Sequence, residues 1–255
     1  MPRFNKVPAI TLAFWIIKIM ATTVGETAAD LLSMTLKLGL TITSYVMAAL
    51  LIVSLIAQFR AKKYVPVIYW IVVVFISVVG TLTSDNLVDN MGVSLVTTTI
   101  VFSVALALVF IVWYAVEKTL SVHTIYTARR ELFYWAAILF TFSLGTSAGD
   151  LLSERLAFGY AWSAVMFAAG IAVVFAAYRL GMNGVLAFWI AYILTRPLGA
   201  SIGDLLTAAP DEGGLGLGTI PVNVVFFIVI VVLVTYLTRE EKKNPQQPVM
   251  NVMPA

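Results

Sequence analysis

Long apolar stretches alternate with short polar segments along the whole chain. The apolar stretches lie near residues 9–31, 38–59, 65–85, 93–117, 131–152, 157–178, 184–206 and 219–238. Each is close to the roughly 20 residues that an α-helix needs to cross the hydrocarbon core of a bilayer. The pattern therefore predicts an all-α polytopic membrane protein with eight transmembrane helices.

The composition agrees with this prediction. Of the 255 residues, 61% are hydrophobic and 11% are charged, whereas soluble domains average about 25% charged residues. The polar segments between the apolar stretches are too short to fold as separate domains. We therefore expect a single transmembrane domain over residues 1–240, followed by a polar tail over residues 241–255 that we predict to be a disordered cytoplasmic segment.

The basic residues predict the orientation of the helices. Most fall in segments on one side of the membrane: Arg3, Lys6, Arg60, Lys62, Lys63, Lys118, Arg129, Arg130, Arg179, Arg239, Lys242 and Lys243. The segments on the other side hold only Lys37 and Arg155. Because lysine and arginine are enriched in cytoplasmic loops, we expect both termini to be cytoplasmic.

The first, third, fifth and seventh apolar stretches share one motif. Each contains a tryptophan, a glycine ten residues later and an aspartate five residues after the glycine: Trp15, Gly25 and Asp30; Trp70, Gly80 and Asp85; Trp135, Gly145 and Asp150; Trp189, Gly199 and Asp204. The motif divides the chain into four two-helix repeats, about residues 8–64, 65–120, 129–182 and 183–239. Since each repeat crosses the membrane twice, all four have the same, parallel orientation.

Four tandem two-helix units, each with its tryptophan, resemble a family of bacterial membrane proteins built from four copies of a repeat of unknown function. The resemblance covers the chain from about Pro8 to Thr238. It implies eight spans in a multi-pass protein of the bacterial cytoplasmic (inner) membrane. It implies no particular activity, so the function has to be inferred from the residues.

The repeated glycines and tryptophans have mainly structural interpretations. The residue four positions after each repeat glycine is also small, and it is Gly149 and Gly203 in the last two repeats. Such small-xxx-small stripes let helix backbones approach closely in lipid, so we interpret these glycines as helix-packing positions. The tryptophans near one end of each span fit either anchoring at the membrane interface or a repeated contact in the core.

The repeated aspartates are the main candidates for a functional site. Asp30, Asp85, Asp150 and Asp204 are expected at one depth, near the outer end of their helices, where they would form an acidic ring if the repeats surround a common axis. Glu26, Lys18 and Arg196 are charged residues inside predicted spans, where ionisable groups usually pair or mark a pathway. We interpret Lys18 and Arg196 as a gate or as counter-charges for the carboxylates.

Several kinds of chemistry lack the residues they need. The chain has no cysteine and a single histidine, His123, so histidine-based zinc, haem and copper–thiolate sites have no ligands, and we expect no cofactor. Neither a nucleophile–histidine pair nor a phosphate-binding loop occurs, so we do not expect an enzyme. The net charge of +3 reflects membrane topology, and we expect no nucleic-acid partner.

The preferred hypothesis is a transporter or channel for a small hard cation, because carboxylate and hydroxyl oxygens suit such ions. Mn²⁺, Mg²⁺ and coupling to protons are left open, and the identity of a metal stays unknown. The alternative is a membrane sensor, scaffold or partner subunit in which the motif serves helix packing. The expected partners are the lipid bilayer and a small cation, and a homo-oligomer is left open.

Overall fold

The computed structural model describes residues 4–244, which contain helices and no strands. The long helices are α1 (Leu12–Asp30), α2 (Leu40–Arg60), α3 (Pro66–Asp85), α4 (Leu95–Glu117), α5 (Ala128–Asp150), α6 (Gly159–Arg179), α7 (Gly184–Thr207) and α8 (Thr219–Lys243). Within the described range all eight are long and apolar enough to cross a membrane. The predicted eight-span, all-α fold is confirmed.

The end of the last helix differs from its predicted position. Helix α8 continues to Lys243, beyond the expected end at residue 238 and into the segment that we predicted to be disordered. Arginine, glutamate and lysine are good helix formers, and Lys242 and Lys243 lie in the last turn, where cations interact favourably with the helix dipole. The rest of that segment, residues 245–255, lies outside the described residues.

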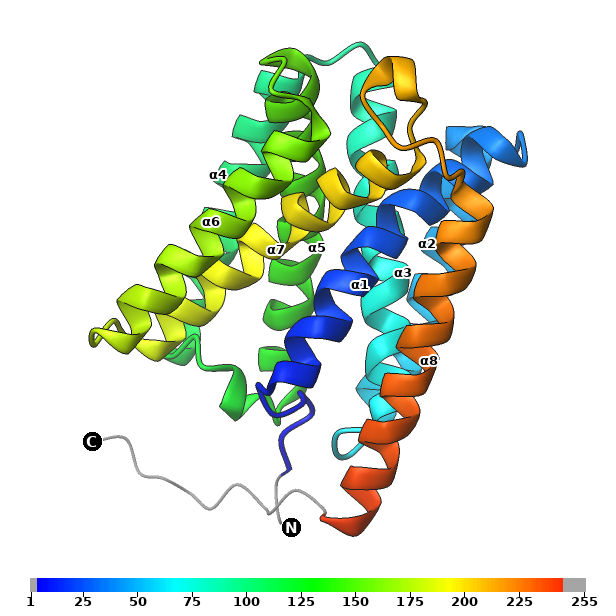
Figure 1. The fold of residues 1–255 in the computed structure, drawn as a ribbon. Coiled ribbons are helices and arrows are strands. Elements are labelled where there is room, and N and C mark those ends of the chain that lie inside the picture. Colours follow the sequence, from blue (N-terminus) through cyan, green and yellow to red (C-terminus); the bar gives the residue numbers. More distant parts are fainter. Residues whose placement is uncertain (1–3, 245–255) are drawn as a thin grey trace.

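The eight helices form an inner and an outer group (Figure 1). The first helices of the repeats, α1, α3, α5 and α7, are 61–67% buried over their most apolar windows, whereas the second helices, α2, α4, α6 and α8, are 17–22% buried. Each inner helix packs against two other inner helices, in the closed order α1, α3, α5, α7 and back to α1. The repeat motif therefore lies on a four-helix inner bundle.

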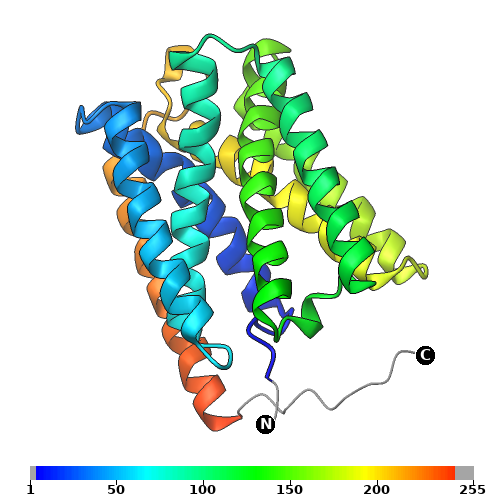
Figure 2. The same cartoon turned by 180° about the vertical axis from the view of Figure 1, so that it is seen from behind.

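Each outer helix packs mainly against the inner helix of the next repeat. The contacting pairs are α2 with α3, α4 with α5, α6 with α7, and α8 with α1. Short loops join the first three pairs into hairpins, but nothing in the chain order joins α8 to α1. Figure 2 shows, from behind, α2 beside α3 and α4 beside α5. The contact between α8 and α1 closes the circle of repeats.

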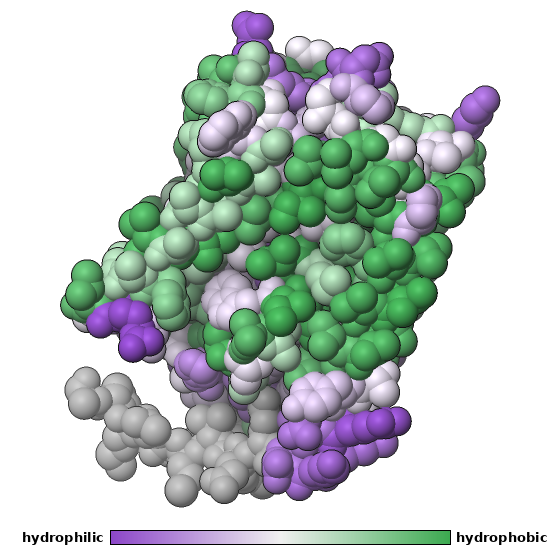
Figure 3. Space-filling model, viewed as in Figure 1, coloured by the Kyte–Doolittle hydropathy of each residue, from purple (hydrophilic) through white to green (hydrophobic). Residues whose placement is uncertain are grey.

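The outer helices carry most of the exposed apolar surface. Large exposed side chains include Ile52 on α2, Ile111 on α4, Phe175 on α6 and Val231 on α8. Figure 3 shows an apolar belt between polar ends. Such a belt on the outside of a helical bundle is typical of a protein that faces lipid, in agreement with a multi-pass membrane protein.

The repeat glycines mark the closest approaches between the inner helices. A Cβ atom on each of these glycines would fall within 2.5–2.7 Å of a Cβ atom on the next inner helix. The facing pairs are Gly25 with Ser77, Gly80 with Phe142, Gly145 with Arg196, and Gly199 with Thr22. Each partner lies three residues before the glycine of its own repeat. One type of contact thus recurs four times around the bundle.

An aromatic layer closes the inner bundle at the end where α1 begins and α8 ends. Each repeat tryptophan follows another aromatic residue, and that residue contacts the tryptophan of the next repeat. The ring centroids lie 5.7 Å apart for Phe14 and Trp70, 5.5 Å for Tyr69 and Trp135, 6.2 Å for Tyr134 and Trp189, and 5.7 Å for Phe188 and Trp15. Trp70, Trp135 and Trp189 are buried and Trp15 is half-buried. The tryptophans therefore form a repeated core contact, and anchoring at an interface does not describe the three buried ones.

A buried pair of hydroxyl groups in this layer gives a first testable prediction. Tyr69 and Tyr134 are both fully buried, and their hydroxyl oxygens lie 2.6 Å apart. Replacing Tyr69 with phenylalanine leaves the other hydroxyl without a partner, which costs about 1–3 kcal/mol of unfolding free energy. The double variant Tyr69→Phe/Tyr134→Phe removes both polar groups and should unfold close to wild type. Thermal unfolding of wild type and the two variants in detergent measures this difference, and equal stability of the single and double variants would contradict it.

The segment before α1 forms a strap across the same end of the bundle. The backbone of Asn5 accepts a hydrogen bond from Tyr64 N, and Lys6 N donates to Ile125 O. The Lys6 ammonium lies 2.6 Å from Glu131 Oε2 on α5 and 3.0 Å from the carbonyl oxygen of Phe59 on α2. Lys6 and Glu131 are both buried. The Lys6 ammonium therefore joins the strap to the first repeat, through Phe59, and to the third repeat, through Glu131.

Candidate functional site

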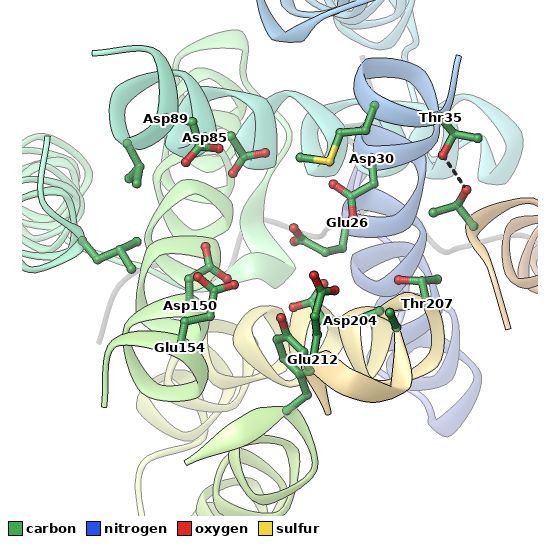
Figure 4. A pocket seen from close by; sticks show the side chains of 17 residues that line it. Glu26, Asp30, Thr35, Asp85, Asp89, Asp150, Glu154, Asp204, Thr207 and Glu212 are labelled. Atoms are coloured by element: carbon green, nitrogen blue, oxygen red, sulfur yellow. Dashed lines mark hydrogen bonds between the residues drawn. The ribbon is translucent and has the colours of Figure 1, made fainter. Parts of the chain in front are cut away.

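A cavity of about 400 Å³ opens at the end of the bundle opposite the aromatic layer. It is lined by the aspartates of all four repeats, Asp30, Asp85, Asp150 and Asp204, together with Glu26. Figure 4 shows these carboxylates on four different helices, directed toward a common space. The structure thus brings the four predicted aspartates and Glu26 together, and we refer to this cavity as the acidic vestibule.

Local helix geometry places the aspartates of the first three repeats. Asp30, Asp85 and Asp150 are the last residues of α1, α3 and α5, and each is followed by a five-residue π-helical turn. In these turns Leu36 N, Met91 N and Leu156 N donate to carbonyl oxygens five residues earlier. Turns of this kind are rare and occur frequently at functional sites. In the fourth repeat, Asp204 lies inside α7, which continues to Thr207.

The four aspartates have no hydrogen-bond or ion-pair partner among the described residues. Their side chains are half-buried at the vestibule wall. Within residues 4–244, no three acidic or histidine side chains are close enough together to hold a metal ion directly. The four carboxyl groups therefore line the vestibule without forming a cluster that could hold a metal ion directly.

Three further acidic side chains line the vestibule that the repeat motif did not predict to belong to the site. Asp89 and Glu154 each follow a repeat aspartate by four residues, and Glu212 lies in the short 3₁₀ helix Pro210–Glu212. The matching positions of the other repeats, Met34 and Ala208, also line the vestibule. Residues four apart share a helix face. The position four residues after each repeat aspartate was therefore a sequence signal that could have identified Asp89 and Glu154 as vestibule residues. Glu212 had no such signal.

Arg196 and Glu26 form an ion pair at the floor of the vestibule. Arg196 Nη2 lies 2.9 Å from Glu26 Oε2. The Arg196 side chain is fully buried, and Glu26 is 6% exposed. The same nitrogen donates to Thr146 Oγ1 at 2.7 Å and to Thr81 Oγ1. Arg196 thus connects all four inner helices.

Lys18 lies apart from the carboxylates. Its ammonium group is buried and has no hydrogen-bond acceptor among the described residues. It lies 4.2 Å from the ring centroids of both Phe142 and Tyr192, so cation–π attraction replaces an ion pair. Lys18 and Arg196 both lie inside the inner bundle, but only Arg196 contacts a carboxylate.

The fold and the vestibule together define a polytopic α-helical membrane protein with a fourfold-repeated inner bundle that surrounds an acidic cavity. The chain belongs to the family defined by a repeat of unknown function (DUF347), whose model matches residues 13–64, 68–119, 133–180 and 187–243. These four matches confirm the predicted resemblance and the four-repeat organisation. Neither a curated protein nor a solved structure matches this chain.

Proposed function

We propose that this protein is a transporter or channel for a small hard cation and that the acidic vestibule is its outer site. The observation that carries the proposal is the convergence of Asp30, Asp85, Asp150 and Asp204 on one cavity, without a counter-ion among the described residues. Rings of acidic side chains select for cations in other pores. Low-dielectric walls around such a ring strengthen its field and raise the local cation concentration.

The proposal extends to orientation and location. The bias of basic residues toward the end where α1 begins and α8 ends supports a cytoplasmic location for that end, so the vestibule would face outward. With the family resemblance, this supports the inner membrane of a bacterium. The Arg196–Glu26 pair and the aromatic layer close the pathway below the vestibule, so conduction requires that these contacts open.

The competing candidate is a sensor, scaffold or partner subunit. The close contacts of the repeat glycines favour it, because they show that part of the motif serves packing. Packing alone does not require four unpaired carboxylates around one cavity. The two candidates differ in what they predict for charge-neutralising variants of the aspartates.

Neutralising one vestibule aspartate should impair flux while leaving the protein folded. A carboxylate about 8 Å from a cation contributes about 2 kcal/mol at an effective dielectric constant of about 20, so Asp85→Asn or Asp150→Asn should lower the apparent cation affinity about thirtyfold. The measurement is flux into proteoliposomes for H⁺, Na⁺, K⁺, Mg²⁺, Mn²⁺ and Ca²⁺.

Asp211→Asn is the matched control, since Asp211 is exposed and does not line the vestibule. Its flux should equal that of wild type. Unfolding temperatures establish that each variant is folded. If the folded wild type carries none of these ions, or if the vestibule variants conduct as well as the control, the transport proposal is wrong.

A further inference from the structure

Three oxygen atoms from three repeats converge on one point at the floor of the vestibule. They are Glu26 Oε2 on α1, Thr81 Oγ1 on α3 and Thr146 Oγ1 on α5, and all three surround Arg196 Nη2. Glu26 also lines the vestibule. Glu26 thus links this point to the vestibule, whereas Thr81, Thr146 and Arg196 are fully buried and do not line the cavity.

The repeat pattern explains why these three oxygens meet. Glu26, Thr81 and Thr146 each directly follow the repeat glycine, so they occupy one structural position at one depth. The fourth repeat has Ala200 there, which has no side-chain oxygen. That repeat instead supplies Arg196, whose side chain extends across the axis to the oxygens of the other three repeats.

The contacts suit a compact cation better than a guanidinium group. An arginine frequently pairs with a carboxylate through two nitrogens in a planar fork. Here all three oxygens gather on Nη2, which has two hydrogens, while the buried Nη1 and Nε have no partner among the described residues. Oxygen atoms gathered around a single centre are the kind of ligands that hard cations use, and here the protein supplies three of them.

We propose that Glu26 Oε2, Thr81 Oγ1 and Thr146 Oγ1 form a binding site for a monovalent hard cation, and that Arg196 is a tethered cation that occupies this site in the closed state. A single carboxylate balances a single positive charge, which favours a monovalent ion. An ion arriving from the vestibule would displace the guanidinium. The role of this site in transport rests on the proposed function. Cation binding by the site can be tested independently of that function.

Removing the tethered cation should expose the site. In Arg196→Met, whose side chain keeps the Cβ and Cγ atoms that pack on Gly145, we expect Na⁺ to raise the unfolding temperature saturably. Choline chloride at equal ionic strength should not do so. Wild type should respond to Na⁺ at least tenfold more weakly. Na⁺ affinity is measured by titration during thermal unfolding in detergent.

Two double variants test the ligands. Adding Thr146→Val to Arg196→Met should weaken the Na⁺ response at least tenfold, and adding Glu26→Gln should abolish it. The matched control is Thr141→Val in the same background, because Thr141 is a fully buried threonine on the same helix and is not among the hydrogen-bond partners of Arg196. Equal Na⁺ responses of the Thr146 and Thr141 variants, or tighter binding of Mg²⁺ or Mn²⁺ than of Na⁺, would overturn the assignment.

A second variant keeps the test decisive if Arg196→Met does not fold. Arg196→Lys places a compact ammonium with three donors near the three oxygens, so it should unfold no lower than wild type. A clear loss of stability would show that the guanidinium itself is required and would contradict the site.

Flux separates this inference from the transport proposal. If Arg196→Met binds Na⁺ but neither wild type nor any variant shows flux, the cation site is supported and the transport proposal is wrong. If flux depends on the aspartates but Arg196→Met does not bind Na⁺, the transport proposal is supported and the cation site is wrong.

Discussion

Replacing Lys6 with methionine is expected to cause the largest loss of stability of any single change considered for this chain. The substitution leaves the carboxylate of Glu131 buried without its counter-charge, since the Lys6 ammonium lies 2.6 Å from it and both side chains are under 10% exposed. Breaking one partner of a buried ion pair costs about 3–5 kcal/mol. The lost hydrogen bond to the Phe59 carbonyl adds to this cost.

The loss of stability is expected to be specific to Lys6, because the strap places its side chain against Glu131. Lys63 lies in the neighbouring loop and is exposed, so Lys63→Met should unfold like wild type and serves as the matched control. The double variant Lys6→Met/Glu131→Gln removes both charges and should recover most of the loss, because Gln58 can still hydrogen-bond at this position. Thermal unfolding in detergent compares the four proteins, and similar unfolding of Lys6→Met and Lys63→Met would show that the ion pair contributes little.

Replacing Gly145 with alanine is expected to have the second largest effect. The added methyl group would lie 2.5 Å from Arg196 Cβ and 2.9 Å from Pro197 Cδ, so one of the helices α5 and α7 must move. Overpacking of this kind typically costs about 1–3 kcal/mol and occasionally more. It also moves Arg196 relative to Glu26 and Thr146, which hold its Nη2 atom.

Gly149→Ala is the matched control on the same helix. A methyl group there would lie 3.6 Å from its nearest neighbour, the Cβ atom of Ala200, which is an ordinary van der Waals distance. Alanine is about 1 kcal/mol more favourable than glycine in a helix, so this variant should be as stable as wild type or more stable. Unfolding curves of both variants measure the contrast, and an equal loss in both would mean that small residues are needed along the whole stripe.

The contrast between these two glycines shows what the sequence motif could resolve. The spacing predicts that Gly145 and Gly149 lie on one helix face, and on that basis we interpreted both as helix-packing positions. The structure confines the closest contact to Gly145, because Arg196 and Pro197 of α7 cross α5 at that depth. The crossing point of two helices depends on their tilt and rotation, which spacing within one helix does not encode.

Lys18 and Arg196 likewise show that the sequence predicts which charged residues are buried but not which residues they contact. Both were expected inside the bundle, and both are fully buried. Arg196 contacts Glu26, whereas Lys18 lies between Phe142 and Tyr192. The partner of a buried cation depends on which helix faces it, and the sequence contained no signal for the two aromatic rings.

The sequence by itself determined the eight spans, the four repeats and the depth of each repeated residue. It could do so because the bilayer imposes a fixed helix length, and because a motif that recurs without gaps has to recur at the same height in each unit. Tertiary structure alone decided that α8 closes the circle against α1 and that four aspartates share one cavity. It also decided that Arg196 joins Glu26, Thr81 and Thr146. These contacts connect residues 50 to 170 positions apart, and they depend on how the helices rotate toward a common axis once their apolar faces are packed.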